Sequence, residues 1–284
     1  MPLSTLALII MAAALHASWH LLVKRAERRH LFTGWALAVG AVLYSPVLFL
    51  YGFADRSVWL YAFVSALVQA AYFLMLVRAY ERADFSLVYP IARGAAPGLL
   101  ALWGGLFLGE RLRPAGIAGL ACLLLGLVAV GGGLSPKRRP LNLKSREIVI
   151  ALGVALCISV YSAIDGAVVR STPVLPYLAL VMVLTALFVT PFLFAHYGVR
   201  QAVACWRAQR ARIILVGILP SLPYLLVLKV YAVSGVSYAG ALREVSIVFA
   251  ALAGWLLLGE PFGAMRAAGS FLIFAGIIVI ALAR

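Results

Sequence analysis

Charged side chains are scarce in this 284-residue chain, and acidic ones are the scarcest. Asp, Glu, Lys and Arg make up 12% of the residues, whereas a typical soluble domain carries roughly 25%. Only nine residues are acidic, while 65% of the chain is apolar and the mean hydropathy is +1.06. So little charge excludes an ordinary soluble protein and predicts one that is embedded in a lipid bilayer.

Cysteine is also rare, and its positions exclude the usual roles of this residue. The chain contains three cysteines without any CxxC spacing, so we expect neither a disulfide framework nor a cysteine metal site. The sequence also lacks a Walker motif for nucleotide phosphates. We therefore predict that the chain holds no cofactor and no metal ion.

The shortage of carboxylates argues against catalysis. The fragment DGAVVR at Asp165–Arg170 faintly resembles enzymes that transfer lipid head groups. Such chemistry needs several carboxylates to hold metal ions and phosphate, and nearly all of the nine acidic residues lie at expected helix ends. A membrane-embedded head-group enzyme is only a distant alternative, and we predict that the protein is not an enzyme.

In place of charge the chain has a series of apolar runs, each about 20 residues long and thus able to span a bilayer. The runs are apolar on all sides, without the alternation that marks membrane β-strands, and this predicts helices. We predict ten transmembrane helices, at residues 3–23, 33–53, 57–77, 86–108, 115–133, 147–169, 176–197, 211–232, 237–258 and 264–282.

A duplicated segment divides the chain into two halves. The sequence LFLGERL at Leu106–Leu112 returns as LLLGEPF at Leu256–Phe262, and the positions differ by 150 (260 − 110). The same offset places Arg93 on Arg243, so each half carries one arginine within an apolar run. The pattern therefore predicts two repeats of five helices each.

The longest polar stretch, SPKRRPLNLKSRE, separates the repeats. We assign the first repeat to residues 1–134, a basic linker to 135–146 and the second repeat to 147–284. Because five is odd, the second repeat must be inverted relative to the first, as in many transporters whose substrate site lies between the repeats. The predicted fold is an all-α integral membrane protein with ten transmembrane helices, arranged as two inverted five-helix repeats around a central cavity.

Loop charges predict the orientation and the partners. Loops on one side of the membrane hold sixteen Lys and Arg residues, and those on the other side hold six. Positively charged loops face the cytoplasm, so we expect both termini on the non-cytoplasmic side.

The basic loops also explain the net charge of +15, so this charge does not indicate a nucleic-acid partner. The expected partners are the lipid bilayer and a small-molecule substrate. Ten helices can enclose a cavity within one chain, so we expect a monomer.

The paired Leu-Gly-Glu motifs, each followed by a last helix rich in Gly and Ala, resemble the drug/metabolite transporter superfamily, EamA type, over the whole chain. The resemblance implies a secondary active or facilitative transporter that works by alternating access and exports small metabolites, with amino acids as the favoured class. Members of the superfamily also move other solutes, so another anionic or zwitterionic one (a phosphonate, a sugar phosphate or a drug) is the alternative. The opening HASWHLLVK at His16–Lys24 is similar to a bacterial subgroup, which implies the bacterial inner membrane.

Two intramembrane arginines are the first candidates for the substrate site. A charge within the bilayer is costly and marks function, and a guanidinium group matches a carboxylate or phosphate in bidentate fashion. Arg93 and Arg243, one from each repeat, therefore suit an anionic or zwitterionic solute, and Glu244 suits an ammonium group. The alternative is that Arg243 pairs with Glu244 or with a lipid head group and only anchors its helix.

Polar and aromatic residues in other spans complete the expected site, because apolar walls with a few polar groups are usual for small molecules. The candidates are Tyr89, His16, Trp19, His20, Gln69, Tyr72, Tyr161 and Tyr224. His16 and His20 face one side of a helix, where either can line the cavity, bond a neighbouring helix or carry a proton as the coupling ion. An interfacial belt is the alternative role of the tyrosines.

Prolines and the repeated glutamates are the candidates for gating. Proline frees backbone carbonyls and bends a helix, and irregular backbone within a bilayer is tolerated where it lines a cavity. The candidates for gating or structure are Pro90, Pro97, Pro220, Pro223, Glu110 and Glu260. We expect both glutamates to reach head groups or to cap the following helix. We expect Asp165 to pair with Arg170 near the membrane surface, and a role in coupling is the alternative for Asp165.

Overall fold

The computed structural model of the chain describes residues 3–24, 26–51, 56–82, 85–130, 146–219, 221–249, 252, 256 and 264–282. All regular secondary structure in these ranges is helical, which confirms the all-α prediction. Of the predicted linker only Arg146 is described, as the first residue of a helix.

The helices follow the predicted spans closely in most of the chain. In the first repeat they are α1 (Leu3–Lys24), α2 (Arg29–Tyr51), α3 (Arg56–Arg82), α4 (Phe85–Phe107) and α5 (Pro114–Val130). In the second repeat they are α6 (Arg146–Val168), α7 (Val174–Tyr197), α8 (Val199–Ile218), α9 (Ser221–Val233), α10 (Val236–Arg243) and α12 (Ala264–Leu282).

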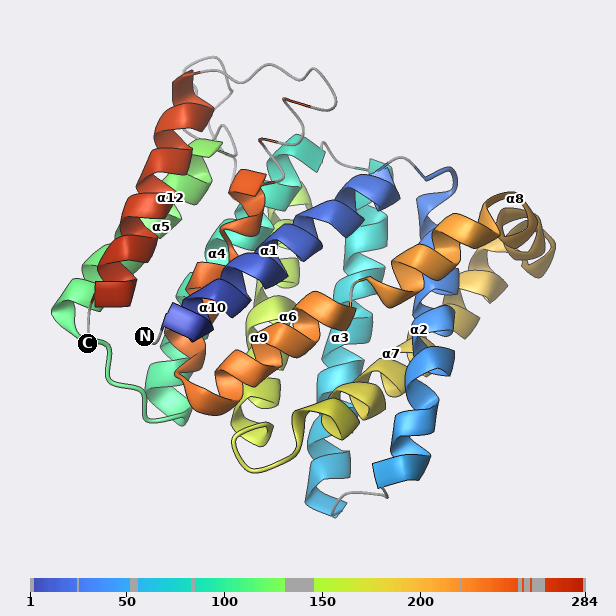
Figure 1. Ribbon diagram of the computed structural model, residues 1–284. Coiled ribbons are helices and arrows are strands. Elements are labelled where there is room, and N and C mark those ends of the chain that lie inside the picture. The colour runs from blue at the N-terminus through green and yellow to red at the C-terminus, as the bar shows by residue number, and fades with distance from the viewer. Residues whose placement is uncertain are drawn as a thin grey trace.

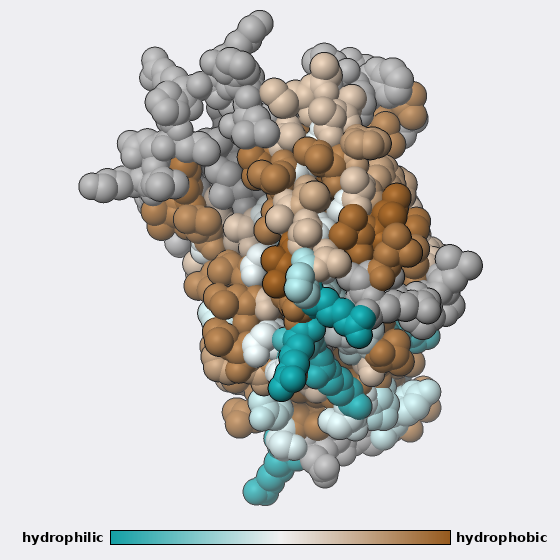
Figure 2. Space-filling view, turned by 90° about the vertical axis from the view of Figure 1, so that its left-hand side faces the viewer, coloured by the Kyte–Doolittle hydropathy of each residue, from teal (hydrophilic) through white to brown (hydrophobic). Residues whose placement is uncertain are grey.

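Long apolar helices allow the chain to cross a membrane. The described segments that are long and apolar enough are Arg29–Tyr51, Arg56–Leu76, Ile148–Val168, Val174–Tyr197 and Val199–Val233. Large apolar side chains such as Phe49, Leu50 and Phe271 are largely exposed, as expected for a surface that lies against lipid. Figure 2 shows one such face, mainly hydrophobic, with hydrophilic side chains gathered in its lower half.

Helices from the two repeats interlock instead of forming two separate bodies (Figure 1). At one end of the molecule α5 packs on α12, and at the other end α2 packs on α7 and α8. Between these ends α6 packs on α3 and α4, while α1 packs on α9 and α10. Each of these contacts joins one repeat to the other, so the described helices form a single bundle.

The contacts between helices follow the symmetry of the two repeats. Helix α6 matches α1, α3 matches the α8–α9 region, and α4 matches the segment that begins with α10. The contact of α6 with α3 therefore corresponds to that of α1 with α9, and the contact of α6 with α4 corresponds to that of α1 with α10. Inverted halves related by a two-fold axis produce such exchanged pairs, which agrees with the predicted two-repeat architecture.

Four glycines bring α5 and α12 into backbone contact. A Cβ atom added at Gly119 would lie 2.9 Å from the Gly276 carbonyl oxygen, and one added at Gly126 would lie 2.6 Å from the Gly269 carbonyl oxygen. Only glycine allows this approach, so small residues determine how closely the two helices pack. The repeat offset of 150 matches Gly119 to Gly269 and Gly126 to Gly276 (269 − 119 and 276 − 126), so the two-fold axis passes between α5 and α12.

The eighth predicted span, residues 211–232, is described except for residue 220. Helix α8 begins at Val199 and ends at Ile218, and α9 begins at Ser221. Gln209 has non-helical dihedral angles, φ −132° and ψ 18°, so α8 is kinked just before the predicted span begins.

The ninth predicted span is interrupted near its middle. Helix α10 ends at Arg243, and the Glu244 amide bonds to the Ala241 carbonyl oxygen at 3.0 Å, three residues back. Such a bond belongs to a tighter 3₁₀ turn, after which residues 246–249 are helical again. The chain therefore changes its helical path at the intramembrane charges themselves.

The equivalent helix of the first repeat, α4, is continuous. It runs from Phe85 to Phe107 and passes through Pro90 and Pro97. The sequence predicted that these prolines bend the helix, and this stays a prediction. The interruption of the equivalent span lies in the second repeat, where the turn has no proline. Packed neighbours and local adjustments can satisfy the backbone groups that a proline frees within a membrane helix.

Candidate functional site

Arg93, Arg243 and Glu244 meet at one buried point, which we term the arginine cluster. The Arg93 Nε atom lies 2.8 Å from Glu244 Oε2, and the Arg243 Nε atom lies 3.3 Å from Glu244 Oε1. The side chains of Arg93, Arg243 and Glu244 are 7%, 8% and 0% exposed. One carboxylate thus holds two guanidinium groups.

A hydroxyl group holds Arg93 at a second point. The Arg93 Nη2 atom donates to Ser246 Oγ at 3.0 Å, and Ser246 is buried. Because Ser246 lies two residues beyond Glu244, the 3₁₀ turn after α10 presents both a carboxylate and a hydroxyl group to α4. The interruption of the ninth span therefore builds the partner of the first repeat's arginine.

Small side chains let α4 approach α6 beside the arginine cluster. The buried contact consists of Ala92, Ala96, Ala151, Val154, Ala155 and Ile158. At the far end of the same contact, Trp103 Nε1 donates to Ser159 Oγ at 3.0 Å. Close packing along its length fixes α4, and with it Arg93, against α6.

Three tyrosines from three helices form a connected aromatic group. Tyr161 on α6 makes edge contacts with Tyr72 on α3 and with Tyr224 on α9, and the ring centroids lie 6.1 Å apart in both pairs. Tyr161 also lies within electrostatic range of the arginine cluster and of Asp165. The aromatic group therefore connects two sets of buried charges.

Asp165 is the centre of a second buried cluster, which we term the aspartate cluster. Tyr177 on α7 donates to Asp165 Oδ1 at 2.6 Å, and Tyr224 on α9 donates to Asp165 Oδ2. Gln69 on α3 donates its amide to the same Oδ2 atom at 3.3 Å. The Asp165 side chain is fully buried, so four helices enclose this carboxylate.

The predicted pairing of Asp165 with Arg170 is wrong. Helix α6 continues to Val168, and Asp165 faces α3, α7 and α9 from its last turn. Arg170 pairs instead with Glu110, with Nη2 2.5 Å from Oε1. The prediction failed because a helix that is apolar on all sides gives no signal of its rotation about its own axis.

Glu110 caps the N-terminus of α10 across the boundary between the repeats. Its Oε1 atom accepts from the Val236 amide at 2.7 Å, and its Oε2 atom accepts from the Ser237 amide at 3.0 Å and the Ser237 hydroxyl at 2.6 Å. A carboxylate there satisfies free amides and favours the helix dipole. The sequence predicted a head group or the following helix, α5, as the partner, whereas the capped helix belongs to the other repeat.

Glycines make room for the Glu110 carboxylate. A Cβ atom at Gly104 would lie 2.8 Å from Glu110 Oε2, and one at Gly235 would lie 3.1 Å from Glu110 Cδ. Gly109 has φ +65°, a left-handed conformation that glycine adopts readily, so the chain can turn directly before Glu110. These contacts explain the Leu-Gly-Glu motif of the first repeat physically, as a turn followed by a cap.

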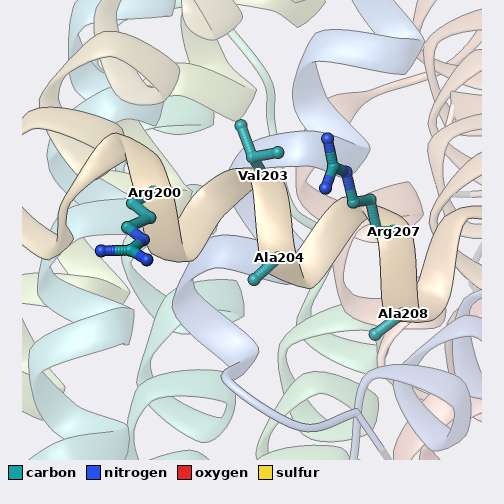
Figure 3. Close-up of a pocket in the computed structure, with 5 residues that line it drawn as sticks. All are labelled: Arg200, Val203, Ala204, Arg207 and Ala208. Carbon is teal, nitrogen blue, oxygen red and sulfur yellow. The ribbon is translucent and has the colours of Figure 1, made fainter.

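A surface groove on α8 lies apart from both clusters (Figure 3). It has a volume of about 730 Å³ and is lined by Arg200, Val203, Ala204, Arg207 and Ala208. Figure 3 shows the two arginines pointing to different sides of the helix, so they do not converge on one ligand. The opposite face of α8 buries Ala202 and Cys205, an arrangement typical of a helix at the membrane surface.

The remaining predicted site residues are placed only in part. The structure describes the backbone, but not the side chains, of Trp19 and His20 on α1 and of Tyr89 and Pro90 on α4. Pro220 and Glu260 lie outside the described residues. His16 is half-buried on α1, a helix that packs on α9 and α10. Pro97 and Pro223 are buried within α4 and α9.

Tyr177 and Ser246 are polar partners that were not predicted from the sequence. A signal existed for Ser246, which follows Arg243 by three residues and so lies about one helical turn away. Tyr177 lies in the first turn of α7, where a tyrosine is indistinguishable by sequence from one in an interfacial belt.

The described helices form a multi-pass bundle built from inverted repeats. The model of the EamA-like transporter family matches residues 3–132 and again residues 145–282. A solved crystal structure covers 98% of this chain and 98% of its own chain, with 21% identity and a TM-score of 0.77, which shows a shared fold. No curated protein matches the chain significantly. The chain belongs to the EamA-like transporter family.

Membership of this family gives the coarse function. The protein is a multi-pass membrane transporter of small solutes, in agreement with its apolar helices and its two repeats. The family is one of transporters, which supports the prediction of a function other than catalysis.

Proposed function

We propose that this protein exports amino acids across the bacterial inner membrane and binds the solute at the arginine cluster. The observation that carries this proposal is that Arg93 and Arg243, which are equivalent in the two repeats, converge on Glu244. The carboxylate of a solute can bind a guanidinium group in bidentate fashion.

A zwitterion matches both signs of charge in the cluster. Its carboxylate would replace Glu244 beside one guanidinium group, and its ammonium group would bind the displaced Glu244. The buried polar groups would thus stay paired, as buried groups generally are. A phosphonate or a sugar phosphate matches the arginines equally well but offers Glu244 no new partner, which favours amino acids over these alternatives.

The aromatic group supplies the apolar wall of the proposed site. Tyr161 lies within electrostatic range of the arginine cluster and contacts Tyr72. Tyrosine combines an apolar ring with a polar tip, so a solute side chain could lie against these rings while its charged groups bind the cluster. His16, Trp19, His20 and Tyr89 remain proposed contributors to the same wall.

Transport would proceed by alternating access, either driven by a gradient or facilitative. Interrupted helices line the substrate sites of many transporters, and α10 ends directly beside Glu244. The contact of Glu110 with α10 and Arg170 ties α4, α6 and α10 together on one face. This contact would have to open to expose the site there, and the loop charges predict that this face is the non-cytoplasmic one.

A thermal-shift screen of the purified protein tests the substrate class. The panel contains the proteinogenic amino acids, polyamines, phosphonates and sugar phosphates. A bound ligand raises the melting temperature by mass action, so we expect amino acids to stabilise the protein and polyamines, which lack an anionic group, to have no effect. Stabilisation by phosphonates or sugar phosphates alone would support the alternative anionic substrate.

Counterflow of radiolabelled amino acids into proteoliposomes tests transport itself. We expect exchange in vesicles that contain the wild-type protein and none in protein-free vesicles. Chemical alteration of the solute would indicate an enzyme, and an ion current would indicate a channel.

A further inference from the structure

We infer that Asp165 is a proton-binding site that couples solute transport to a proton gradient and is separate from the arginine cluster. The inference rests on the proposed transport function and gives it an energy source. It assigns the proton to Asp165 on α6, for which the sequence left a coupling role open, and not to His16 and His20 on α1.

The described hydrogen-bond partners of Asp165 are all neutral. Tyr177 and Tyr224 donate hydroxyl groups, and Gln69 donates an amide. Ser65 is fully buried, and its hydroxyl group accepts from the same Gln69 amide at 3.4 Å. Among the residues that the structure describes, no Lys, Arg or His forms an ion pair with this carboxylate.

Among the described side chains, Glu244 is the other fully buried carboxylate, and Asp165 differs from it because Glu244 holds two guanidinium groups. An ionised group that is buried without a counter-charge is far more costly than a paired one, and a proton removes that charge. Hydroxyl groups both donate and accept, so Tyr177 and Tyr224 can bond the carboxylate or its protonated form. The aspartate cluster can therefore hold Asp165 in either state without an unpaired polar group.

The polar and charged side chains near Asp165 come from several helices. Helices α3, α7 and α9 contribute the neutral amide and hydroxyl groups of the aspartate cluster, together with Tyr72. The charged groups that face this region come from α4, which carries Arg93, and from the end of α10, which carries Arg243 and Glu244. Tyr161, one turn from Asp165 on α6, lies within electrostatic range of these three residues and of Asp165. A solute carboxylate bound at the arginine cluster would therefore change the field at Asp165.

The position of Asp165 gives the proton a route from one face. Asp165 lies in the last turn of α6, just before Arg170, which pairs with Glu110. Opening of that contact would admit water to the carboxylate. A hydronium ion would transfer its proton to an Asp165 oxygen, forming an O–H bond and leaving a water molecule. After the conformational change the O–H bond would break, and water on the opposite face would accept the proton as hydronium. In an exporter the proton would move inward as the solute moves outward.

Proteoliposomes that contain the trapped pH-sensitive dye pyranine test the coupling in the wild-type protein. External addition of a mixture of the proteinogenic amino acids should make the lumen more alkaline, because protons leave as solute enters. An imposed acidic lumen should raise the initial rate of radiolabelled uptake several-fold, and an equal sodium gradient should leave it unchanged. Counterflow without proton movement, or uptake driven by sodium, would overturn the inference and leave the transport proposal intact.

The variant Asp165→Asn separates coupling from solute exchange. Asparagine keeps the shape of the side chain but cannot bind the proton, so counterflow at equal pH should persist while stimulation by the pH gradient is lost. The control Glu27→Gln, which neutralises an exposed carboxylate, should keep both activities. Retained stimulation in Asp165→Asn, or equal loss of counterflow and stimulation in a well-folded variant, would overturn the inference.

Infrared difference spectroscopy supplies a readout that needs no solute. Lowering the pH of the wild-type protein should increase the carbonyl band of a protonated carboxyl group, and Asp165→Asn should lack this change. An identical change in both proteins would overturn the inference.

Absence of counterflow with amino acids would reject only the substrate class, because a pyranine signal with a phosphonate or sugar phosphate would still support proton coupling. Absence of any pyranine signal across the whole panel would overturn the coupling.

Discussion

The charge balance of the arginine cluster depends on Glu244 more than on either arginine. Removal of Arg93 leaves Arg243 paired with Glu244, whereas removal of Glu244 takes away the carboxylate that pairs with both buried guanidinium groups. Breaking a buried pair is costly mainly because of the charge that is left behind. The three side chains therefore contribute unequally to stability.

We expect Glu244→Gln to lower the free energy of unfolding by about 3–5 kcal/mol. Arg93→Gln should cost less, about 1–3 kcal/mol, because mainly hydrogen bonds are lost. Denaturation of the detergent-solubilised variants without ligand measures both effects, with Glu27→Gln as the exposed control. A larger loss from Arg93→Gln than from Glu244→Gln would contradict this charge balance.

The two clusters differ in how far the sequence predicts them. Arg93 and Arg243 were identifiable because charge is rare in an apolar run and because the duplication pairs the two positions. The aspartate cluster was not identifiable as a unit, although Gln69 and Tyr224 were separate candidates. Its members come from four helices that have no polar face, so the sequence does not indicate how each helix is rotated about its own axis. Only the packed structure shows that these side chains meet around Asp165.

At the scale of the helix pair, backbone contact between α5 and α12 leads to a stability prediction. In Gly126→Ala the added methyl group would lie 2.6 Å from the Gly269 carbonyl oxygen and 2.8 Å from the Ile273 nitrogen. The helices would have to separate, at a cost of about 1–3 kcal/mol, which thermal denaturation measures.

Gly105→Ala is the matched control for this prediction. The nearest atom to its added Cβ is the Glu110 carbonyl oxygen at 3.8 Å, an ordinary contact. Alanine is favoured over glycine in a helix by up to about 1 kcal/mol, so this variant should be at least as stable as the wild type. Similar melting temperatures for both variants would argue against glycine-determined packing of α5 and α12.

The cap on α10 predicts a local effect of Glu110. Glu110→Ala removes the acceptor for the Val236 and Ser237 amides, and loss of a cap costs about 1 kcal/mol. Hydrogen exchange at the start of α10, measured by mass spectrometry, should therefore accelerate roughly fivefold. Glu27→Ala is the control. Unchanged exchange in Glu110→Ala would mean that the carboxylate does not hold the helix end.

Helix existence was predictable from hydrophobic runs, but helix interruptions were not. The turn after Arg243 lies within apolar sequence. Proline was the expected cause of irregularity, yet α4 is continuous through Pro90 and Pro97. The turn at Glu244 is stabilised instead by tertiary contacts, since its carboxylate binds two arginines that the turn brings together.

At the scale of the whole molecule, the inverted relation of the repeats followed from counting spans. An odd number of membrane crossings per repeat requires opposite orientations, and the exchanged contacts of α1 and α6 agree with this. The relation predicts that the two Leu-Gly-Glu corners, at Glu110 and Glu260, emerge on opposite faces of the membrane.

Labelling with a membrane-impermeant maleimide checks this topology. Single cysteines replace Arg111 and Phe262 in a background in which Cys122, Cys157 and Cys205 are serine. We expect Arg111→Cys to react from the side of the termini and Phe262→Cys to react from the cytoplasmic side. Reaction of both from one side would rule out inverted repeats.

The most direct test of the substrate site is equilibrium binding of the radiolabelled amino acid that stabilises the protein best. The comparison includes wild type, Arg93→Gln and the exposed control Arg111→Gln. We predict at least a tenfold loss of affinity in Arg93→Gln, or about 1.4 kcal/mol, and wild-type affinity in Arg111→Gln. Wild-type affinity in a folded Arg93→Gln would contradict the assignment of solute binding to the arginine cluster.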